Sequence, residues 1–166
     1  DDTPPLIKQF QLDLLTQMAG AGNADELRNL IPKLLPQITG CVERLRQGDV
    51  APKDLAITQR ISRTPENYAQ QCSQAIAAEL AISYGQDLHP GQSVAYVHTD
   101  AHARHPLDRV ALPGTAAAAH YDADKYVELL LRATDTLLAP LGWDYQKLFR
   151  YVSPQASPRL LQRTLY

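Results

Sequence analysis

Apolar residues recur at helical spacing in three long stretches of the chain. Residues three and four positions apart share one face of a helix, so each stretch predicts a helix with one buried side. The first stretch covers residues 6–18 and stops at the glycines of AGAGN, the second covers 24–47, and the third follows Asp122 and stops near Pro140. A shorter helix is predicted for DYQKLFRYV, residues 144–152.

The second stretch contains two prolines, Pro32 and Pro36. Proline removes a backbone donor and disfavours helix in the residue before it. The sequence therefore predicts a kink or two helical pieces, with the better helix after Pro36. Asn23 followed by Glu26 has the pattern of a capping box and predicts where this stretch begins.

Three shorter stretches favour β-strands. Leu55, Ile57 and Ile61 alternate with polar or small residues, although Gln59 interrupts the inward-facing set. GQSVAYVH, residues 91–98, and LDRVAL follow as β-prone runs separated by a polar loop. The predicted fold class is mostly α with a small β-sheet (α+β).

Composition narrows the function classes. The 166 residues are 45% hydrophobic with a net charge of -2, typical of a folded domain and unlike an autonomous, strongly basic DNA-binding protein. Any contact with nucleic acid must be local, and residues 145–166, which contain no acidic residue, form a basic tail. The isolated Cys41 and Cys72 and the lack of a membrane-spanning run predict a cytoplasmic protein with no membrane partner. The start without methionine predicts a processed product or a piece of a longer protein.

Two clusters have the residue types of metal sites. Asp122 and Asp124 in YDADKY resemble an Asp-x-Asp pair, but acids at a helix start also cap free N–H groups. HTDAHARH, residues 98–105, brings together three histidines and an aspartate, whose spacing matches no structural zinc pattern; an exposed polar loop is the alternative. Phosphate loops, dinucleotide fingerprints and nucleophile elbows are missing from the sequence. We predict no catalytic residue, metal site or cofactor in this chain.

The junction AITQRISRTPENYAQQ, residues 56–71, combines cations, hydroxyls and a predicted helix start. Thr64 is a candidate N-cap for a helix that extends to about Tyr84, and its free N–H groups favour anions. Glu66 in the first turn opposes an anion there. Arg60, Ser62 and Arg63 precede this start, so the junction is a candidate phosphate site, with a solvated surface turn as the alternative.

The order of these segments resembles the C-terminal thumb region of family B DNA polymerases. The resemblance covers roughly residues 6–148 and rests on IKQFQLDLL, GDVAPKDLAITQRISRTPENY, AIAAELAISYG, HPGQSVAYV, DRVAL and YDADKYVELLLRATDTLLAPLGW. It implies a polymerase thumb-like helical domain, with N-terminal helices in 1–50, the thumb with its small sheet in 51–150 and a basic C-terminal tail in 151–166.

In that family the catalytic aspartates and their Mg²⁺ belong to the palm, which precedes the thumb. The resemblance therefore implies a non-catalytic portion of a DNA-directed DNA polymerase, either an excised domain or the small product of a split gene. Its partners would be primer-template DNA and the remaining polymerase domains, and its role would be processivity in DNA replication. The implied DNA-binding residues are Arg60, Ser62, Arg63 and Thr64, with Gln74 and Arg109 as weaker candidates.

The last five residues, QRTLY, resemble the short peptide with which bacterial polymerases bind the sliding clamp. Gln162, Leu165 and Tyr166 are the matching positions, and Tyr166 replaces the more common phenylalanine. A frayed basic tail is the alternative.

Two other functions fit parts of the sequence. A stand-alone helical module could bind a protein partner through the proline-containing second stretch, without a DNA role. A small metal-dependent hydrolase would use the histidine-rich loop and hold zinc.

Overall fold

The computed structural model describes residues 2–62 and 72–155 of the chain. Contacts divide the chain into two units: unit 1 comprises Asp1–Leu6 and Val50–Asp122, and unit 2 comprises Ile7–Asp49 and Ala123–Tyr166. The predicted segments 1–50, 51–150 and 151–166 group the chain differently and stay a prediction. The fold class is confirmed, since helices predominate and the described strands form a three-stranded antiparallel sheet.

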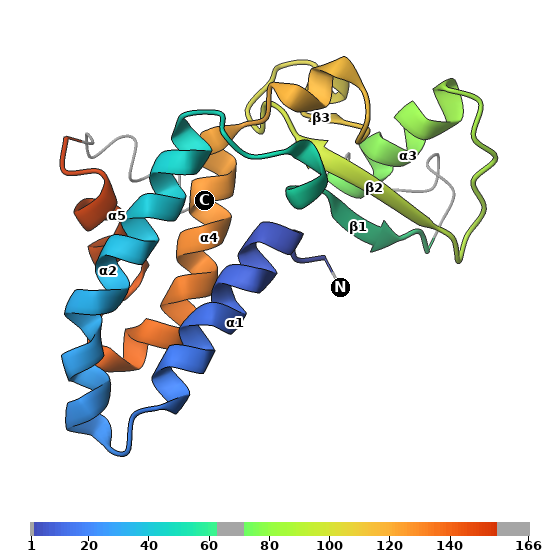
Figure 1. Ribbon diagram of the computed structural model, residues 1–166. Helices are drawn as coiled ribbons and strands as arrows, with labels where there is room; N and C mark the ends of the chain where they lie inside the picture. The colour runs from blue at the N-terminus through green and yellow to red at the C-terminus, as the bar shows by residue number, and fades with distance from the viewer. Residues whose placement is uncertain (1, 63–71, 156–166) are drawn as a thin grey trace. The chain divides into compact units, whose positions relative to one another are not determined.

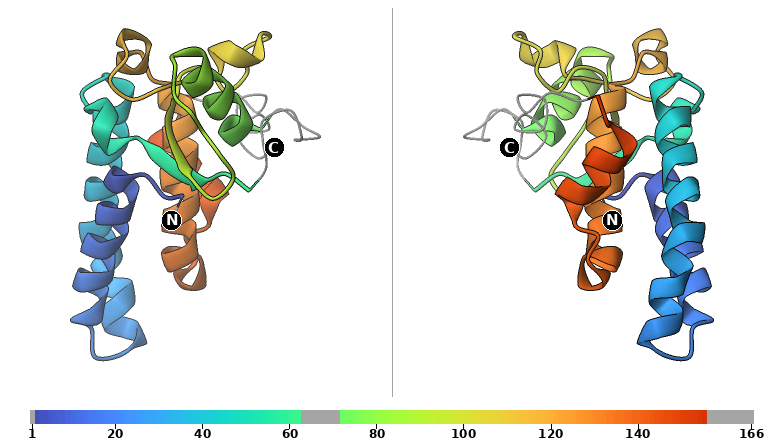
Figure 2. Two further views of the ribbon diagram at one scale, coloured as in Figure 1. Left: turned by 90° about the vertical axis from the view of Figure 1, so that its right-hand side faces the viewer. Right: turned by 90° about the vertical axis from the view of Figure 1, so that its left-hand side faces the viewer.

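Unit 2 is helical. Its elements are α1 (Pro5–Ala19, whose first residues belong to unit 1), α2 (Ala24–Arg46), α4 (Ala123–Leu138), the short η5 (Ala139–Leu141) and α5 (Tyr145–Val152). Helices α1 and α2 form a hairpin, and α4 packs against both α2 and α5 (Figures 1 and 2). The apolar stripes supply the core, because the side chains that they predict to face inward are buried, including Leu14, Leu34, Leu130 and Leu148.

Helix α2 passes through both prolines as one helix of 23 residues, so of the two predicted outcomes, a kink or two pieces, the second is excluded. Pro32 and Pro36 are four residues apart on the exposed side. The carbonyl groups that lose a partner there can bind water, while the opposite side buries Ile31, Leu34 and Ile38. At the start, Asn23 accepts a hydrogen bond from the Glu26 N–H at 2.9 Å, as the capping pattern predicts.

Unit 1 is built on a sheet in the order β1-β2-β3. Strand β1 (Ile57–Arg60) pairs antiparallel with β2 (Ser93–His98), which pairs antiparallel with β3 (Val110–Ala111). Helix α3 (Ser73–Ser83) packs against β2 and β3 (Figure 1). The short helices η1 (Pro52–Asp54), η3 (Pro106–Asp108) and η4 (Ala116–Ala119) lie in its connections. All three predicted strands are therefore confirmed.

The predicted helix from Thr64 to Tyr84 is wrong as a continuous element. Thr64 lies outside the described residues, but Cys72 has extended backbone, with φ -74° and ψ 160°, and is the N-cap of α3. Tyr84 follows the last helical residue, as predicted. The sequence predicted a helix start at Thr64 because its capping signal is strong. It did not predict the start of α3 at Ser73, because the preceding residue, Cys72, is not a favourable N-cap.

We expect Pro36→Ala to stabilise unit 2. Alanine restores an N–H that can donate to the Pro32 carbonyl, which stabilises the folded helix. Loss of proline also makes the unfolded chain more flexible, which opposes this gain, so the free energy of unfolding should rise by about 1–2 kcal/mol in total. Urea unfolding followed by the fluorescence of Trp143, the single tryptophan, reports on this unit.

Lys33→Ala, at an exposed position of the same helix, is the matched control and should change stability by less than about 0.5 kcal/mol. An unfolding midpoint for Pro36→Ala at or below that of the control would contradict the prediction.

Candidate nucleic-acid interface

Arg60 is the last residue of β1, and its side chain is exposed. Its backbone pairs with Ser93 of β2, and its Nε donates a hydrogen bond to the Gly91 carbonyl at 2.9 Å. Within the described part of the chain, no carboxylate forms an ion pair with Arg60. Among the described residues, the guanidinium is therefore oriented by a neutral carbonyl group.

The turn that orients Arg60 depends on Gly91. Its φ of +96° lies in the region that favours glycine, so a side chain there would strain the backbone. The Gly91 N–H donates to the Ile61 carbonyl at 2.7 Å, and the Ile61 N–H donates to the Gln92 carbonyl at 2.7 Å. These two bonds extend the β1–β2 pairing beyond Arg60 and fix the Gly91 carbonyl in place.

The first turn of α3 lies beside the same strand end. Gln74 donates from Nε2 to the Arg60 carbonyl at 2.5 Å, which ties the start of α3 to the end of β1. The first turn of α3 contains no acidic residue, and Cys72 makes no side-chain cap there. The amide N–H groups of this turn add a partial positive charge next to Arg60. Glu66, which was predicted to oppose an anion here, lies outside the described residues.

The other predicted members of the junction are partly described. Ser62 is exposed two residues after Arg60. Arg63 and Thr64, and the clamp-binding positions Gln162, Leu165 and Tyr166, lie outside the described residues. The structure thus brings Arg60, Ser62 and Gln74 together at one end of the sheet.

Arg109 lies at the other end of β2. It precedes Val110, which pairs with His98, whereas Arg60 pairs with Ser93. Five residues of extended strand separate these two points, roughly 17 Å. Arg109 donates from Nε to the Ala103 carbonyl at 3.0 Å and helps to fold the loop before β3. Arg109 therefore lies apart from the Arg60 cluster, and its predicted contact with DNA stays a prediction.

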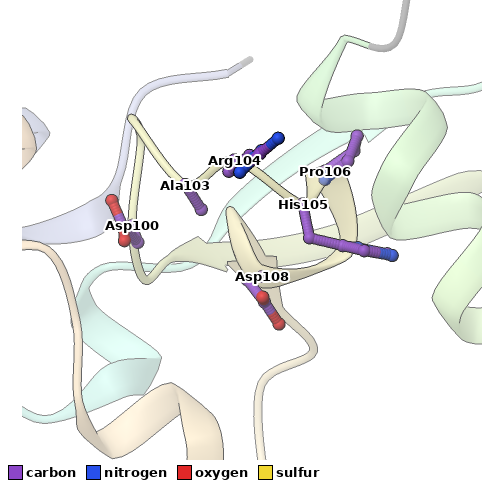
Figure 3. A pocket seen from close by; sticks show the side chains of 6 residues that line it. All are labelled: Asp100, Ala103, Arg104, His105, Pro106 and Asp108. Carbon is purple, nitrogen blue, oxygen red and sulfur yellow. The ribbon is translucent and has the colours of Figure 1, made fainter.

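The histidine-rich loop does not form a metal centre in the described residues, where no group of three or more His, Cys, Asp or Glu side chains could hold an ion. His98 is buried in β2, and its ring meets the Tyr96 ring edge-on at 5.5 Å. The His105 Nδ1 accepts a hydrogen bond from the Leu107 N–H at 3.2 Å. His105 also lines a depression of about 500 Å³, whose side chains do not converge on a common point (Figure 3).

Asp122 has a structural role that the sequence did not predict. Its Oδ2 accepts a hydrogen bond from the Ala101 N–H at 2.8 Å, and its own N–H donates to the His98 carbonyl at 2.9 Å. The acid holds the loop after β2. Asp124 lies in the first turn of α4, where its charge complements the helix dipole.

Gln59, which interrupts the predicted apolar alternation, has a partner on the inner side of the sheet. The Tyr96 hydroxyl donates to its Oε1 at 2.7 Å. Burial, assisted by the charge of Asp2, raises the pKa of Tyr96 above its ordinary value of 10.0. The pair braces β1 against β2 one residue before Arg60.

Both cysteines are free thiols, Cys41 buried and Cys72 exposed. Burial raises the pKa of the Cys41 thiol and opposes its ionisation to a thiolate. In the described residues no helix is both long and apolar enough to cross a membrane.

Sequence reasoning missed two residues that shape this interface. Gly91 supplies the acceptor that orients Arg60, and the Pro90-Gly91 turn signal was available to place it. Cys72 starts α3, and no signal in the sequence marks it because cysteine is not a favoured N-cap.

The fold is similar to part of the family B DNA polymerase from the hyperthermophilic archaeon Pyrobaculum calidifontis, with a TM-score of 0.60 and 18% sequence identity. The similarity covers 94% of this chain and 18% of that polymerase chain, so this chain spans less than a fifth of its length. No protein-family model and no curated protein matches the sequence. The chain therefore has a polymerase-like fold.

The Tyr96–Gln59 pair predicts a pH-dependent stability. Unfolded Tyr96 loses its proton near pH 10, whereas the folded residue keeps it to higher pH, so its contribution to stability is full below pH 10 and is lost as pH rises above it. Tyr96→Phe should cost about 1 kcal/mol at neutral pH through the lost hydrogen bond. Above pH 10 the difference between the two proteins should shrink by up to about 1.4 kcal/mol per pH unit.

Urea unfolding followed by far-UV circular dichroism between neutral pH and pH 11 measures this difference. Tyr84→Phe, at a ring that is 68% exposed, is the control. A constant difference between wild type and Tyr96→Phe across the pH range would show that burial does not govern this hydroxyl.

Proposed function

We propose that this chain is a non-catalytic portion of a DNA-directed DNA polymerase, the thumb, and that it grips the primer-template duplex to support processivity. The observation that carries the proposal is the fold similarity to a family B DNA polymerase over 94% of the chain. The segment order that resembles a family B thumb supports the same function. The chain would act with the palm and the other domains of its parent enzyme.

The Arg60 cluster supplies the groups that such a grip requires. Arg60 is exposed, oriented and without a carboxylate partner among the described residues. Ser62 adds a hydroxyl, and the first turn of α3 adds N–H groups with no acid beside them. Such groups contact phosphates without reading bases, as an enzyme that copies any template needs. Arg63 and Thr64 would extend the contact along the chain.

Gln74 acts in this proposal as a positioning residue, because its amide donates to the Arg60 carbonyl. Arg109, at the far end of β2, would contact a separate phosphate. Nucleotidyl transfer would take place in the palm of the parent enzyme, whose carboxylates would hold Mg²⁺. The chain by itself would then be inactive in primer extension.

We expect Arg60→Ala/Arg63→Ala to weaken binding to a labelled primed duplex, measured by fluorescence anisotropy at several salt concentrations. Each lost phosphate contact should lower the slope of log affinity against log salt by about 0.9, and affinity at low salt should fall at least roughly fivefold. Arg60→Ala alone should show about half of the change in slope.

Arg28→Ala is the matched control, since Arg28 is exposed, belongs to α2 of unit 2 and pairs with Asp25 at 3.4 Å. Equal losses in the double mutant and in Arg28→Ala would mean that general charge, and not the Arg60 cluster, attracts the duplex. Wild-type protein that binds no duplex at low salt would favour a protein-interaction role.

For the C-terminal peptide we propose binding to a sliding clamp through Gln162, Leu165 and Tyr166. Two apolar side chains and an amide would enter a hydrophobic groove of the clamp. Leu165→Ala/Tyr166→Ala should reduce affinity for a bacterial sliding clamp at least tenfold in surface plasmon resonance, by roughly 0.8 kcal/mol for each buried methylene lost. Arg163→Ala, between the matching positions, is the control, and equal binding by all three proteins would reject the clamp peptide.

A further inference from the structure

The outer face of α5 carries two cations and an aromatic ring. Its inner face buries four side chains at helical spacing: Tyr145, Leu148, Phe149 and Val152. The outer face exposes Lys147, Arg150 and Tyr151, and the Tyr151 side chain is 43% exposed. Residues three and four positions apart lie side by side on a helix, so the two cations and the ring form one continuous surface.

Trp143 extends this surface before the helix begins. The Lys147 Nζ lies 4.2 Å from the centroid of the Trp143 ring, in cation–π geometry. The Tyr151 ring meets the Trp143 ring edge-on, with centroids 5.8 Å apart and an interplanar angle of 89°. Trp143, Lys147, Arg150 and Tyr151 constitute what we call the aromatic-basic face.

The local charge is positive. Between residues 143 and 155 the one acidic residue is Asp144, and its Oδ1 accepts a hydrogen bond from the Lys147 N–H at 2.9 Å as the N-cap of α5. The surface contrasts with that of α4, where Arg132 forms an ion pair with Glu128 at 3.1 Å. On the aromatic-basic face the partner of Lys147 is an aromatic ring, and no carboxylate of the described residues forms an ion pair with its ammonium group.

Helix α5 is fixed at both ends, so the face is preorganised. The Tyr145 N–H donates to the Asp135 Oδ1 at 2.8 Å, which ties the start of α5 to α4. Arg46 of α2 donates from Nη1 to the Val152 carbonyl at 2.7 Å and from Nη2 to the Ser153 hydroxyl at the other end. A ligand would not have to order this helix in order to bind.

We propose that the aromatic-basic face binds single-stranded nucleic acid, with an unpaired base stacked on the Tyr151 ring, which Trp143 meets edge-on, and phosphates next to Lys147 and Arg150. Exposed rings between cations provide both stacking and backbone neutralisation, which is how proteins hold single strands without sequence preference. A duplex keeps its bases paired and would leave the rings unused. An acidic peptide would satisfy the cations but has no planar group that requires the rings.

This single-strand surface belongs to unit 2 and shares no residue with the Arg60 cluster of unit 1. Its occupant differs from the proposed duplex, since stacking requires unpaired bases. The two proposals can therefore be tested separately. Arg60→Ala should leave single-strand binding unchanged. In a protein that already carries a variant of the aromatic-basic face, Arg60→Ala should still lower duplex affinity by the same factor as in wild type.

The single tryptophan makes the site directly observable. Titration of the 166-residue protein with unlabelled oligo(dT) should quench the fluorescence of Trp143, and the affinity should fall as salt rises. A blunt duplex at the same phosphate concentration should quench less. Poly-glutamate tests whether any polyanion suffices, and it should not reproduce the quenching.

Variants separate stacking from charge. Tyr151→Ala should weaken oligo(dT) binding at least roughly fivefold. Tyr151→Phe, which keeps the ring, should bind oligo(dT) like wild type. Lys147→Gln/Arg150→Gln should lower the salt slope by about 1.4, which is 0.7 for each phosphate contact with a single strand. Lys33→Gln, at an exposed lysine of α2 in the same unit, is the control and should behave as wild type.

Far-UV circular dichroism and urea unfolding of each variant establish that α5 remains folded. Three results would overturn the proposal: quenching by poly-glutamate equal to that by oligo(dT), unchanged affinity in folded Tyr151→Ala, or equal affinity for the blunt duplex. The first would assign the surface to acidic proteins, and the third to duplex phosphates.

Discussion

Unit 1 depends on the backbone hydrogen bonding of β2 along both of its edges. One edge holds β1, and so determines where Arg60 emerges, while the other holds β3 and the loop that Arg109 and Asp122 stabilise. The pairing is nonlocal, because Arg60 and Ser93 are separated by more than thirty residues of sequence. Burial of Ile57, Tyr96 and Val97 offsets the entropy of closing that loop.

The two candidate surfaces share a physical device. In each, a cation is oriented by an uncharged group: the Gly91 carbonyl for Arg60 and the Trp143 ring for Lys147. A carboxylate in either place would orient the cation equally well but would cancel the charge that an external phosphate needs. Arg28 and Arg132, which pair with Asp25 and Glu128, illustrate that other arrangement.

Local patterns were sufficient to predict most elements, because the buried stripes of α1, α2, α4 and α5 and the alternation in β1 follow directly from helix and strand periodicity. Errors arose where tertiary structure overrode local preference. Pro32 and Pro36 did not divide α2, since both lie on its solvent-exposed side. The strong start signal at Thr64 did not produce one helix through Cys72.

The candidate site was predictable in its residue types and less so in its grouping. The hydrogen bond that joins Gln74 to Arg60 and the separation of Arg109 from both became visible only through tertiary contacts and strand register. The roles of Gln59 and Asp122 depend on partners, Tyr96 and Ala101, that no sequence spacing identifies. The aromatic-basic face could be recognised only once the structure showed which side of α5 is buried.

The chain passes between its two units three times, at Leu6–Ile7, Asp49–Val50 and Asp122–Ala123. Most of unit 1 is therefore an insertion between α2 and α4 of the helical unit. During synthesis the sheet and α3 can pair and pack before α4 leaves the ribosome, whereas α2 has to wait for α4 to cover its apolar side. The helical unit is thus the last to close, although its first helices precede the sheet in the sequence.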